Sequence, residues 1–100
     1  MKAETHLPFG KVDPGLREPE KGLDLSTVYE RSKQIEAMGY DGMVLTETKE
    51  DPFMVLTIAV QATTRINLTT AVALAFPRSP TVTALSAWTL QRLSQGRFIL

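Results

Sequence analysis

Apolar residues along this chain follow two alternating patterns: short apolar runs, and longer stretches with helical spacing. The runs predict strands because apolar and β-branched side chains follow one another without the polar gaps of a surface helix. Runs of this kind cover residues 42–46, 66–74 and 97–100, and residues 2–7 are expected to form a short first strand. The run at 42–46 is apolar almost throughout, which favours a strand buried on both faces, as in a parallel sheet.

A first helix is predicted between the first two strands. It begins near Asp24 or Ser26, where Thr27 and Glu30 have the spacing of a capping box. Gly39 lies where a left-handed residue commonly ends a helix. The predicted buried stripe of this helix comprises Leu25, Val28, Ile35 and Met38.

The second and third predicted helices begin in the same way, with a capping residue followed by proline. Asp51-Pro52 begins a helix that runs to about Thr63, and Ser79-Pro80 begins one that runs to about residue 94. The inner stripe of the second helix is predicted to be Phe53, Leu56 and Val60.

The alternation of strand and helix predicts an α/β fold with a parallel sheet. Residues 8–22 contain three prolines and three glycines and predict a surface loop. We expect one domain over residues 1–100, incomplete at its C-terminus because the last predicted strand has only begun when the chain stops.

Composition narrows the class of protein. The 11 basic and 11 acidic residues cancel, which disfavours nucleic acid and membrane surfaces as partners. The chain has no cysteine and a single histidine, so we expect no metal site. No apolar run approaches the roughly 20 residues of a membrane helix. We therefore expect a cytoplasmic protein.

The turns after the second and third strands contain no glycine. Both a dinucleotide-binding fingerprint and a P-loop need glycine there, so neither is present. Binding residues of α/β folds gather at the carboxyl ends of strands.

Three candidates follow the first two strands. His6 is either a surface bystander or a contact for substrate, and we name it as the substrate-binding candidate. Asp51 is assigned the structural role of helix cap. Glu47, the first carboxylate after its strand, either lies in a solvated turn or binds a polar ligand group.

Further candidates lie around the third strand and third helix. The small side chains of Ala71 and Ala73 would let a flat ring approach the backbone. We expect Arg78 to be a solvated arginine beside a helix cap rather than an anion ligand. Trp88 and the apolar residues around it indicate either packing on the sheet or an interface between subunits.

Four segments in order carry a family resemblance. Residues 38–47 (MGYDGMVLTE) resemble a "GYD-x-VW-x-x-E" motif, and Asp51-Pro52-Phe53 resembles a "DPF" helix start. Residues 63–72 resemble "T-x-R-I-x-LGT-x-V", and residues 78–98 resemble "RSP…TLD-x-LS-x-GRF". Together they resemble luciferase-like flavin and deazaflavin oxidoreductases, most closely the subgroup that uses coenzyme F-420.

The resemblance implies the first half of a (β/α)₈ TIM-type barrel, with its first four strands and three helices. It also implies that the tricyclic cofactor ring stacks at the end of the third strand. There a non-prolyl cis peptide, here Ala71–Val72, presses on the ring. Thr70 adjoins this bond, and Glu47 and Thr48 occupy the positions of residues that face the cofactor.

Two positions depart from the family pattern. Thr48 stands where some relatives have histidine, which removes an obvious proton donor, and Thr69 replaces a glycine. No catalytic acid or base is assigned.

The resemblance implies hydride transfer between F-420 and a small organic substrate, in a homo-oligomer assembled through helices. An FMN-dependent monooxygenase with the same barrel is the alternative. A third interpretation takes the 100 residues alone as a catalytically silent fragment or interaction module that self-associates.

Overall fold

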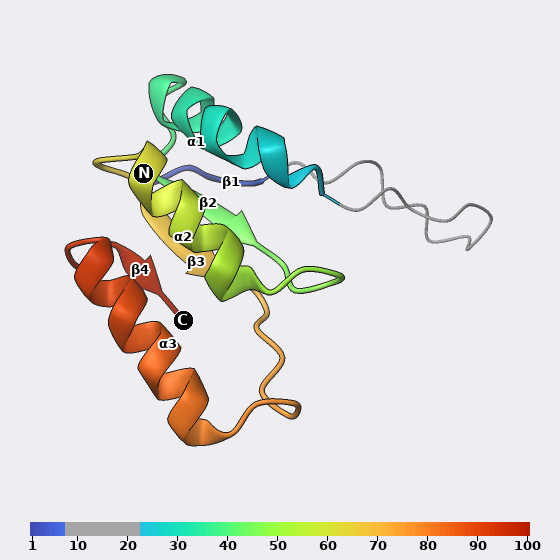
Figure 1. The fold of residues 1–100 in the computed structure, drawn as a ribbon. Coiled ribbons are helices and arrows are strands. Elements are labelled where there is room, and N and C mark those ends of the chain that lie inside the picture. Colours follow the sequence, from blue (N-terminus) through green and yellow to red (C-terminus); the bar gives the residue numbers. More distant parts are fainter. Residues whose placement is uncertain (8–22) are drawn as a thin grey trace.

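The computed structural model describes residues 1–7 and 23–100, whose strands form one parallel sheet (Figure 1). The strands are β1 (Glu4–His6), β2 (Gly42–Leu45), β3 (Asn67–Thr70) and β4 (Phe98–Ile99). They lie in chain order, and each neighbouring pair is parallel. The loop predicted over residues 8–22 lies outside the described residues.

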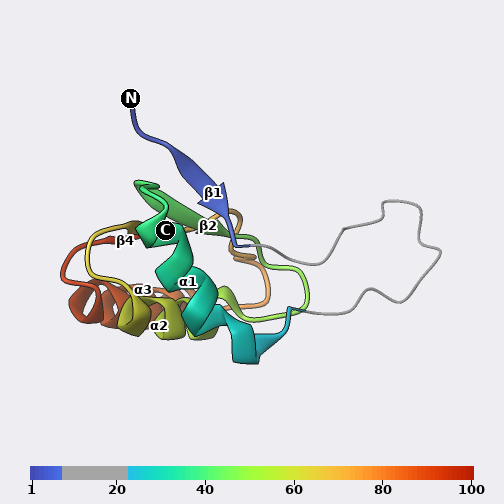
Figure 2. The same cartoon turned by 90° about the horizontal axis from the view of Figure 1, so that it is seen from above.

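The helices connect successive strands and cover one face of the sheet (Figure 2). They are the 3₁₀ turn η1 (Leu25–Thr27) and the helices α1 (Val28–Ala37), α2 (Pro52–Ala62) and α3 (Pro80–Leu93). A doubly wound sheet carries helices on both faces, whereas a (β/α)₈ barrel carries them on one. The sequential strand order and the single helical layer confirm the predicted barrel-type α/β fold.

The core lies between the sheet and the helices. Successive strand residues point to opposite faces, so Met43 and Leu45 of β2 and Leu68 of β3 point towards the helical layer. Their apolar partners from the helices and from neighbouring segments include Leu7, Val28, Ile35, Phe53, Val55, Leu56, Ala59, Val60, Leu90 and Phe98. The predicted stripe of α2 (Phe53, Leu56 and Val60) is confirmed, because all three side chains are buried.

The opposite face of the sheet carries a row of residues in register. His6 pairs with Val44, Val44 with Thr69, and Thr69 with Ile99. This face is the one that the helices leave open, and it would face the interior of a barrel.

The helix starts follow the predicted caps at α2 and α3. One carboxylate oxygen of Asp51 accepts from the amides of Phe53 and Met54, at 2.8 and 3.4 Å. The hydroxyl oxygen of Ser79 accepts from the amide of Val82 at 3.1 Å. Both capping predictions are confirmed.

The predicted capping box of the first helix is wrong. Thr27 already has helical backbone angles, and its hydroxyl donates to the carbonyl of Asp24 instead of accepting from the helix. Asp24 caps the preceding turn η1 through the amide of Ser26. The predicted stripe is half right: Val28 and Ile35 are buried, whereas Leu25 and Met38 are exposed because they lie at the two ends of the helical segment.

β3 is shorter than predicted. It ends at Thr70, whereas the apolar run suggested Leu74. The amide of Ala71 still donates to the carbonyl of Leu45, but the carbonyl of Ala71 accepts from the Thr46 hydroxyl, at 2.7 Å, instead of from a strand amide. The ladder therefore stops there, and the chain leaves the sheet.

Two charged side chains fasten the loops at the amino ends of the strands. The carboxylate of Glu36 accepts from the amides of Thr64, Arg65 and Ile66 just before β3. Burial opposes ionisation of Glu36, but these hydrogen bonds outweigh it and lower its pKa. The guanidinium of Arg97 donates to the hydroxyl and carbonyl oxygens of Thr63 and to the carbonyl of Ile66.

None of the helices in the described part of the chain is long and apolar enough to span a bilayer.

Candidate functional site

The carboxyl ends of β2 and β3 meet at one edge of the sheet, where the predicted site residues gather. Backbone bonds join the two exits: the amide of Glu47 donates to the carbonyl of Val72 at 3.3 Å, and the amide of Ala71 to that of Leu45 at 2.9 Å. Glu47 therefore lies beside the Ala71–Val72 bond, as the resemblance requires. That bond is cis, which confirms the predicted geometry of this peptide.

Glu47 is the most constrained of the predicted residues. One of its carboxylate oxygens accepts from the amide of Leu74 at 2.6 Å and from the guanidinium of Arg78 at 2.7 Å. A second nitrogen of Arg78 lies 3.1 Å from a carboxylate oxygen of Asp51. We call these three side chains the Glu47–Arg78–Asp51 cluster.

The charges of this cluster stabilise one another. The hydrogen bond from Arg78 is the main reason that the pKa of Glu47 lies below its ordinary value of 4.5. The same bond raises the pKa of Arg78. Glu47 is therefore an anion at neutral pH, so its chemistry is that of a hydrogen-bond acceptor and not of a proton donor.

Arg78 is the residue that sequence reasoning assigned wrongly. Only 14 % of its side chain is exposed, so it is not a solvated arginine. The ring of Phe53 lies 5.2 Å from its guanidinium carbon, and the carbonyl of Leu74 accepts from it at 2.8 Å. The available signal was that a lone arginine follows β3 while three carboxylates, Glu47, Glu50 and Asp51, follow β2. The exits of these two strands meet in a parallel sheet.

Residues 71–77, which we call the 71–77 segment, connect the end of β3 to Arg78. Its side chains are small or apolar, and most of them are exposed. Val72 is 70 % exposed, Leu74 48 % and Phe76 fully exposed, whereas Ala73 packs against the core. An apolar surface therefore stands at the carboxyl edge of the sheet.

The remaining predicted residues take different positions around this edge. Thr70 is buried at the end of β3, and Thr48 is exposed in the turn after Glu47. His6 is exposed at the end of β1, in register with Val44 on the open face. The structure thus brings Glu47 and residues 70–72 together. It places His6 on the edge strand β1, on the other side of β2 from β3.

Thr69 is a polar residue that sequence reasoning noted only as a departure from the family pattern. Its hydroxyl oxygen is buried and has no hydrogen-bond partner among the described residues. It faces the open side of the sheet, one residue before Thr70. A buried hydroxyl without a partner is uncommon and is satisfied when a ligand or water reaches it.

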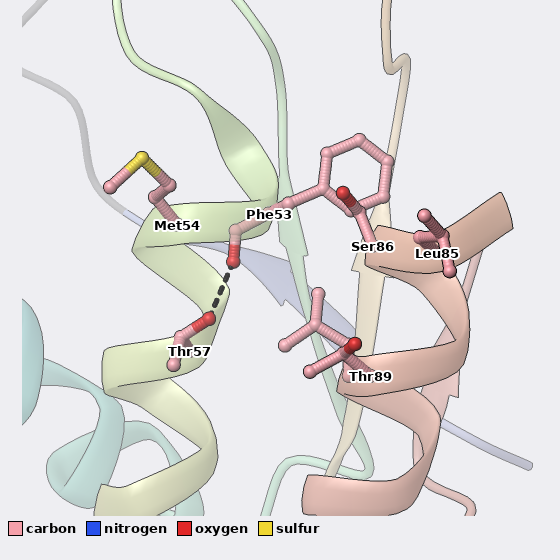
Figure 3. Close-up of a pocket in the computed structure, with 7 residues that line it drawn as sticks. Phe53, Met54, Thr57, Leu85, Ser86 and Thr89 are labelled. Atoms are coloured by element: carbon pink, nitrogen blue, oxygen red, sulfur yellow. Dashed lines mark hydrogen bonds between the residues drawn. The ribbon is translucent and has the colours of Figure 1, made fainter. Parts of the chain in front are cut away.

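A hollow of about 270 Å³ lies elsewhere, between α2 and α3 in the helical layer (Figure 3). Phe53 points from α2 towards α3, where Leu85, Ser86 and Thr89 form the opposite wall. None of the predicted site residues lines this hollow. It is therefore a feature of helix packing, separate from the strand-end site.

α3 is loosely covered by the rest of the chain. Among its fourteen residues Leu90 alone is buried, while Leu85 and Trp88 are 61 % and 65 % exposed. Nothing in the described residues covers this apolar surface, so packing of Trp88 on the sheet is not observed, and the interface between subunits stays a prediction.

Comparison with known proteins identifies the relatives of the chain. The family model for the luciferase-like monooxygenase domain matches residues 6–100. The uncharacterized proteins Rv1360 of Mycobacterium tuberculosis and Mb1395 of Mycobacterium bovis are each 42 % identical to it over 66 residues. These alignments cover 66 % of this chain but only 19 % of each relative, so the matched part spans about a fifth of the relatives' length.

A solved structure shows the same fold. The monooxygenase RslO1 from Streptomyces bottropensis superposes with a TM-score of 0.73 at 24 % identity. The match covers 98 % of this chain and 31 % of that one. With strand order, helical layer and sequence in agreement, the chain belongs to the luciferase-like monooxygenase family.

Proposed function

We propose that this chain supplies part of the cofactor site of an oxidoreductase that transfers a hydride between coenzyme F-420 and a small organic substrate. The observation that carries the proposal is the exposed apolar surface at the joined exits of β2 and β3. Support for F-420 in particular comes from the likeness of residues 38–47 and 63–72 to the deazaflavin-dependent subgroup.

The residues at this edge fit a flat ring with polar substituents. Ala71 and Val72 are both exposed and offer an apolar contact area. Apolar walls with a few placed polar groups are typical of cofactor sites.

The deazaflavin supplies the redox chemistry when it is bound, as the carrier of the hydride. In the proposal, Ala71 and Val72 support one face of the ring and exclude water from it. Glu47 and Thr48 lie towards its polar edge, and Thr70 supports the strand end beneath. His6, at the end of β1, is proposed to contact the substrate.

An FMN-dependent monooxygenase is the second candidate, favoured by the description of the matched family. It would use the same apolar surface, because the ring systems of FMN and F-420 are both tricyclic. The two candidates differ in the cofactor and in the use of oxygen, not in the residues proposed here.

Titration of the full-length protein with F-420 and with FMN tests the proposal. We expect micromolar binding of F-420, and the absorbance spectrum of the bound cofactor distinguishes it from FMN. Tighter binding of FMN would favour the second candidate. Failure of both cofactors to bind would contradict the proposed function.

Substitution at the apolar surface localises the binding. Val72→Glu places a charge where the ring is proposed to lie, and we expect it to weaken binding at least tenfold, since burying an unpaired charge is costly. Met54→Glu is the matched control, because Met54 is similarly exposed (72 %) but lies on α2. Equal loss of affinity in both variants would contradict the proposed location.

A further inference from the structure

Arg78 joins three parts of the strand-end site that are distant in sequence. Its guanidinium pairs with Glu47 after β2 and with Asp51 at the start of α2, and it donates to the carbonyl of Leu74. Glu47 in turn accepts from the amide of Leu74. The Glu47–Arg78–Asp51 cluster therefore holds the 71–77 segment at one residue, through the backbone amide and the backbone carbonyl of Leu74.

The held segment is the one that presents the apolar surface. Val72, Leu74 and Phe76 are exposed, and beyond Thr70 the segment is no longer part of the sheet ladder. At its far end the amide of Arg78 bonds the carbonyl of Ala75 in a local turn. Residues 71 and 72 are also bonded to the end of β2, and the cluster adds the contacts that hold Leu74.

We propose that Arg78 is a positioning residue of the cofactor site, which acts through Glu47 to fix the 71–77 segment in its ligand-receiving position. The inference rests on the proposed function and deepens it. Arg78 touches no proposed ligand atom; its effect on binding passes through Glu47 and Leu74.

The geometry requires arginine at this position. A guanidinium can direct separate N–H groups to Glu47, to Asp51 and to a carbonyl while its flat face rests on an aromatic ring. The ring of Phe53 lies 5.2 Å from the guanidinium carbon. A lysine ammonium keeps the charge but has neither the fork nor the flat face.

The experiment compares Arg78→Lys with the unaltered full-length protein by cofactor titration and by amide hydrogen exchange. We expect the dissociation constant for F-420, or for FMN if that is the cofactor, to rise about tenfold, the scale of one lost charged hydrogen bond. Exchange of the Leu74 amide should accelerate. Exchange of the Leu68 amide, which bonds Arg97 within the sheet, should not change.

Three further variants separate positioning from general destabilisation. Arg92→Lys makes the same substitution at an exposed position on α3 and should change neither binding nor exchange. If Arg78 acts through Glu47 and Leu74, the loss of affinity in the double variant Glu47→Gln with Arg78→Lys is smaller than the sum of the two single losses. Additive losses in the double variant would overturn the inference.

The remaining outcomes are equally decisive. Unchanged affinity in Arg78→Lys, whether or not Leu74 exchange accelerates, contradicts a positioning role. Absence of cofactor binding by the unaltered protein contradicts the proposed function itself and the inference with it. If the unaltered protein binds the cofactor and Arg78→Lys binds it equally well, the inference is contradicted and the proposed function is not.

Discussion

Glu47 and Arg78 show how far the environment of one side chain alters its chemistry. Only 12 % of the Glu47 side chain is exposed, yet its carboxylate stays ionised because Arg78 and the Leu74 amide both donate hydrogen bonds to it. Its folded-state pKa is lowered, so its ion pair contributes stability at pH values above about 4.5. That contribution is lost as the pH falls through the lowered folded-state value.

This linkage gives a prediction for a pH titration. A carboxyl NMR titration should find the midpoint of Glu47 below 4.5, and Arg78→Gln should raise it. Arg92→Gln, at an exposed position on α3, is the control. A midpoint of Glu47 that does not respond to Arg78→Gln would contradict the assigned cause.

Arg97 is a structural counterpart to Arg78. Its guanidinium bonds the hydroxyl and carbonyl of Thr63 and the carbonyl of Ile66, while burial lowers its pKa. Arg97→Met leaves these acceptors without their donor, so we expect the free energy of unfolding to fall by about 2–3 kcal/mol. Urea denaturation measures it, with Arg92→Met as control; equal losses in both variants would refute the structural role of Arg97.

The helix starts show what short-range patterns can predict. Asp51-Pro52 and Ser79-Pro80 begin their helices as expected, because a cap acts within three residues and needs nothing from the rest of the fold. Thr27 fails the same rule because a 3₁₀ turn capped by Asp24 precedes the α-helix. Local spacing alone does not show which of two nearby polar residues takes the first position.

Asp51 has two roles, which substitution can separate. Its Oδ1 atom caps α2 while its Oδ2 atom meets Arg78. Asp51→Asn keeps a capping oxygen and should cost little stability, whereas Asp51→Ala should cost about 1 kcal/mol. Thermal or urea unfolding measures both, with Ser79→Ala as a cap without an ion pair. Equal losses of unfolding free energy in Asp51→Asn and Asp51→Ala would show that Asp51 stabilises the protein through its charge and not through the helix cap.

Strand ends and side-chain partners were harder to predict than elements. Apart from Asn67, the run from Ile66 to Leu74 is apolar or β-branched, yet the ladder stops at Thr70. Beyond it, the Thr46 hydroxyl replaces a strand amide as the donor to the carbonyl of Ala71. The partner of Arg78 lies 31 residues away. Such contacts depend on which strand exits meet, so they follow from the three-dimensional arrangement and not from spacing.

On the scale of the whole chain, exposed apolar side chains gather on α3 and on the 71–77 segment. Within the described residues, β1 and β4 are the edge strands, and each pairs with a neighbour on one side only. The side chains of Leu85 and Trp88 are exposed on α3. Unpaired strand edges and apolar helix faces both favour association. We therefore expect the isolated 100 residues to self-associate.

Analytical ultracentrifugation of this chain tests that expectation. The double variant Leu85→Lys with Trp88→Glu should lower the associated fraction, because it replaces two exposed apolar side chains of α3 with charged ones. Gln34→Glu, a charge added on the exposed side of α1, is the control. A chain that sediments as a monomer and melts cooperatively would contradict the expectation.

Two carboxylates from the first part of the chain hold the two ends of β3. Glu36 binds the amides of residues 64–66 before the strand, and Glu47 binds the amide of Leu74 after it. A slip of β3 along β2 would have to break both sets of bonds at once, so the register of this pair is fixed from outside the ladder. A ligand at this edge would therefore meet a strand pair whose register is already set, and the fully exposed Phe76 lies beyond the last of these bonds.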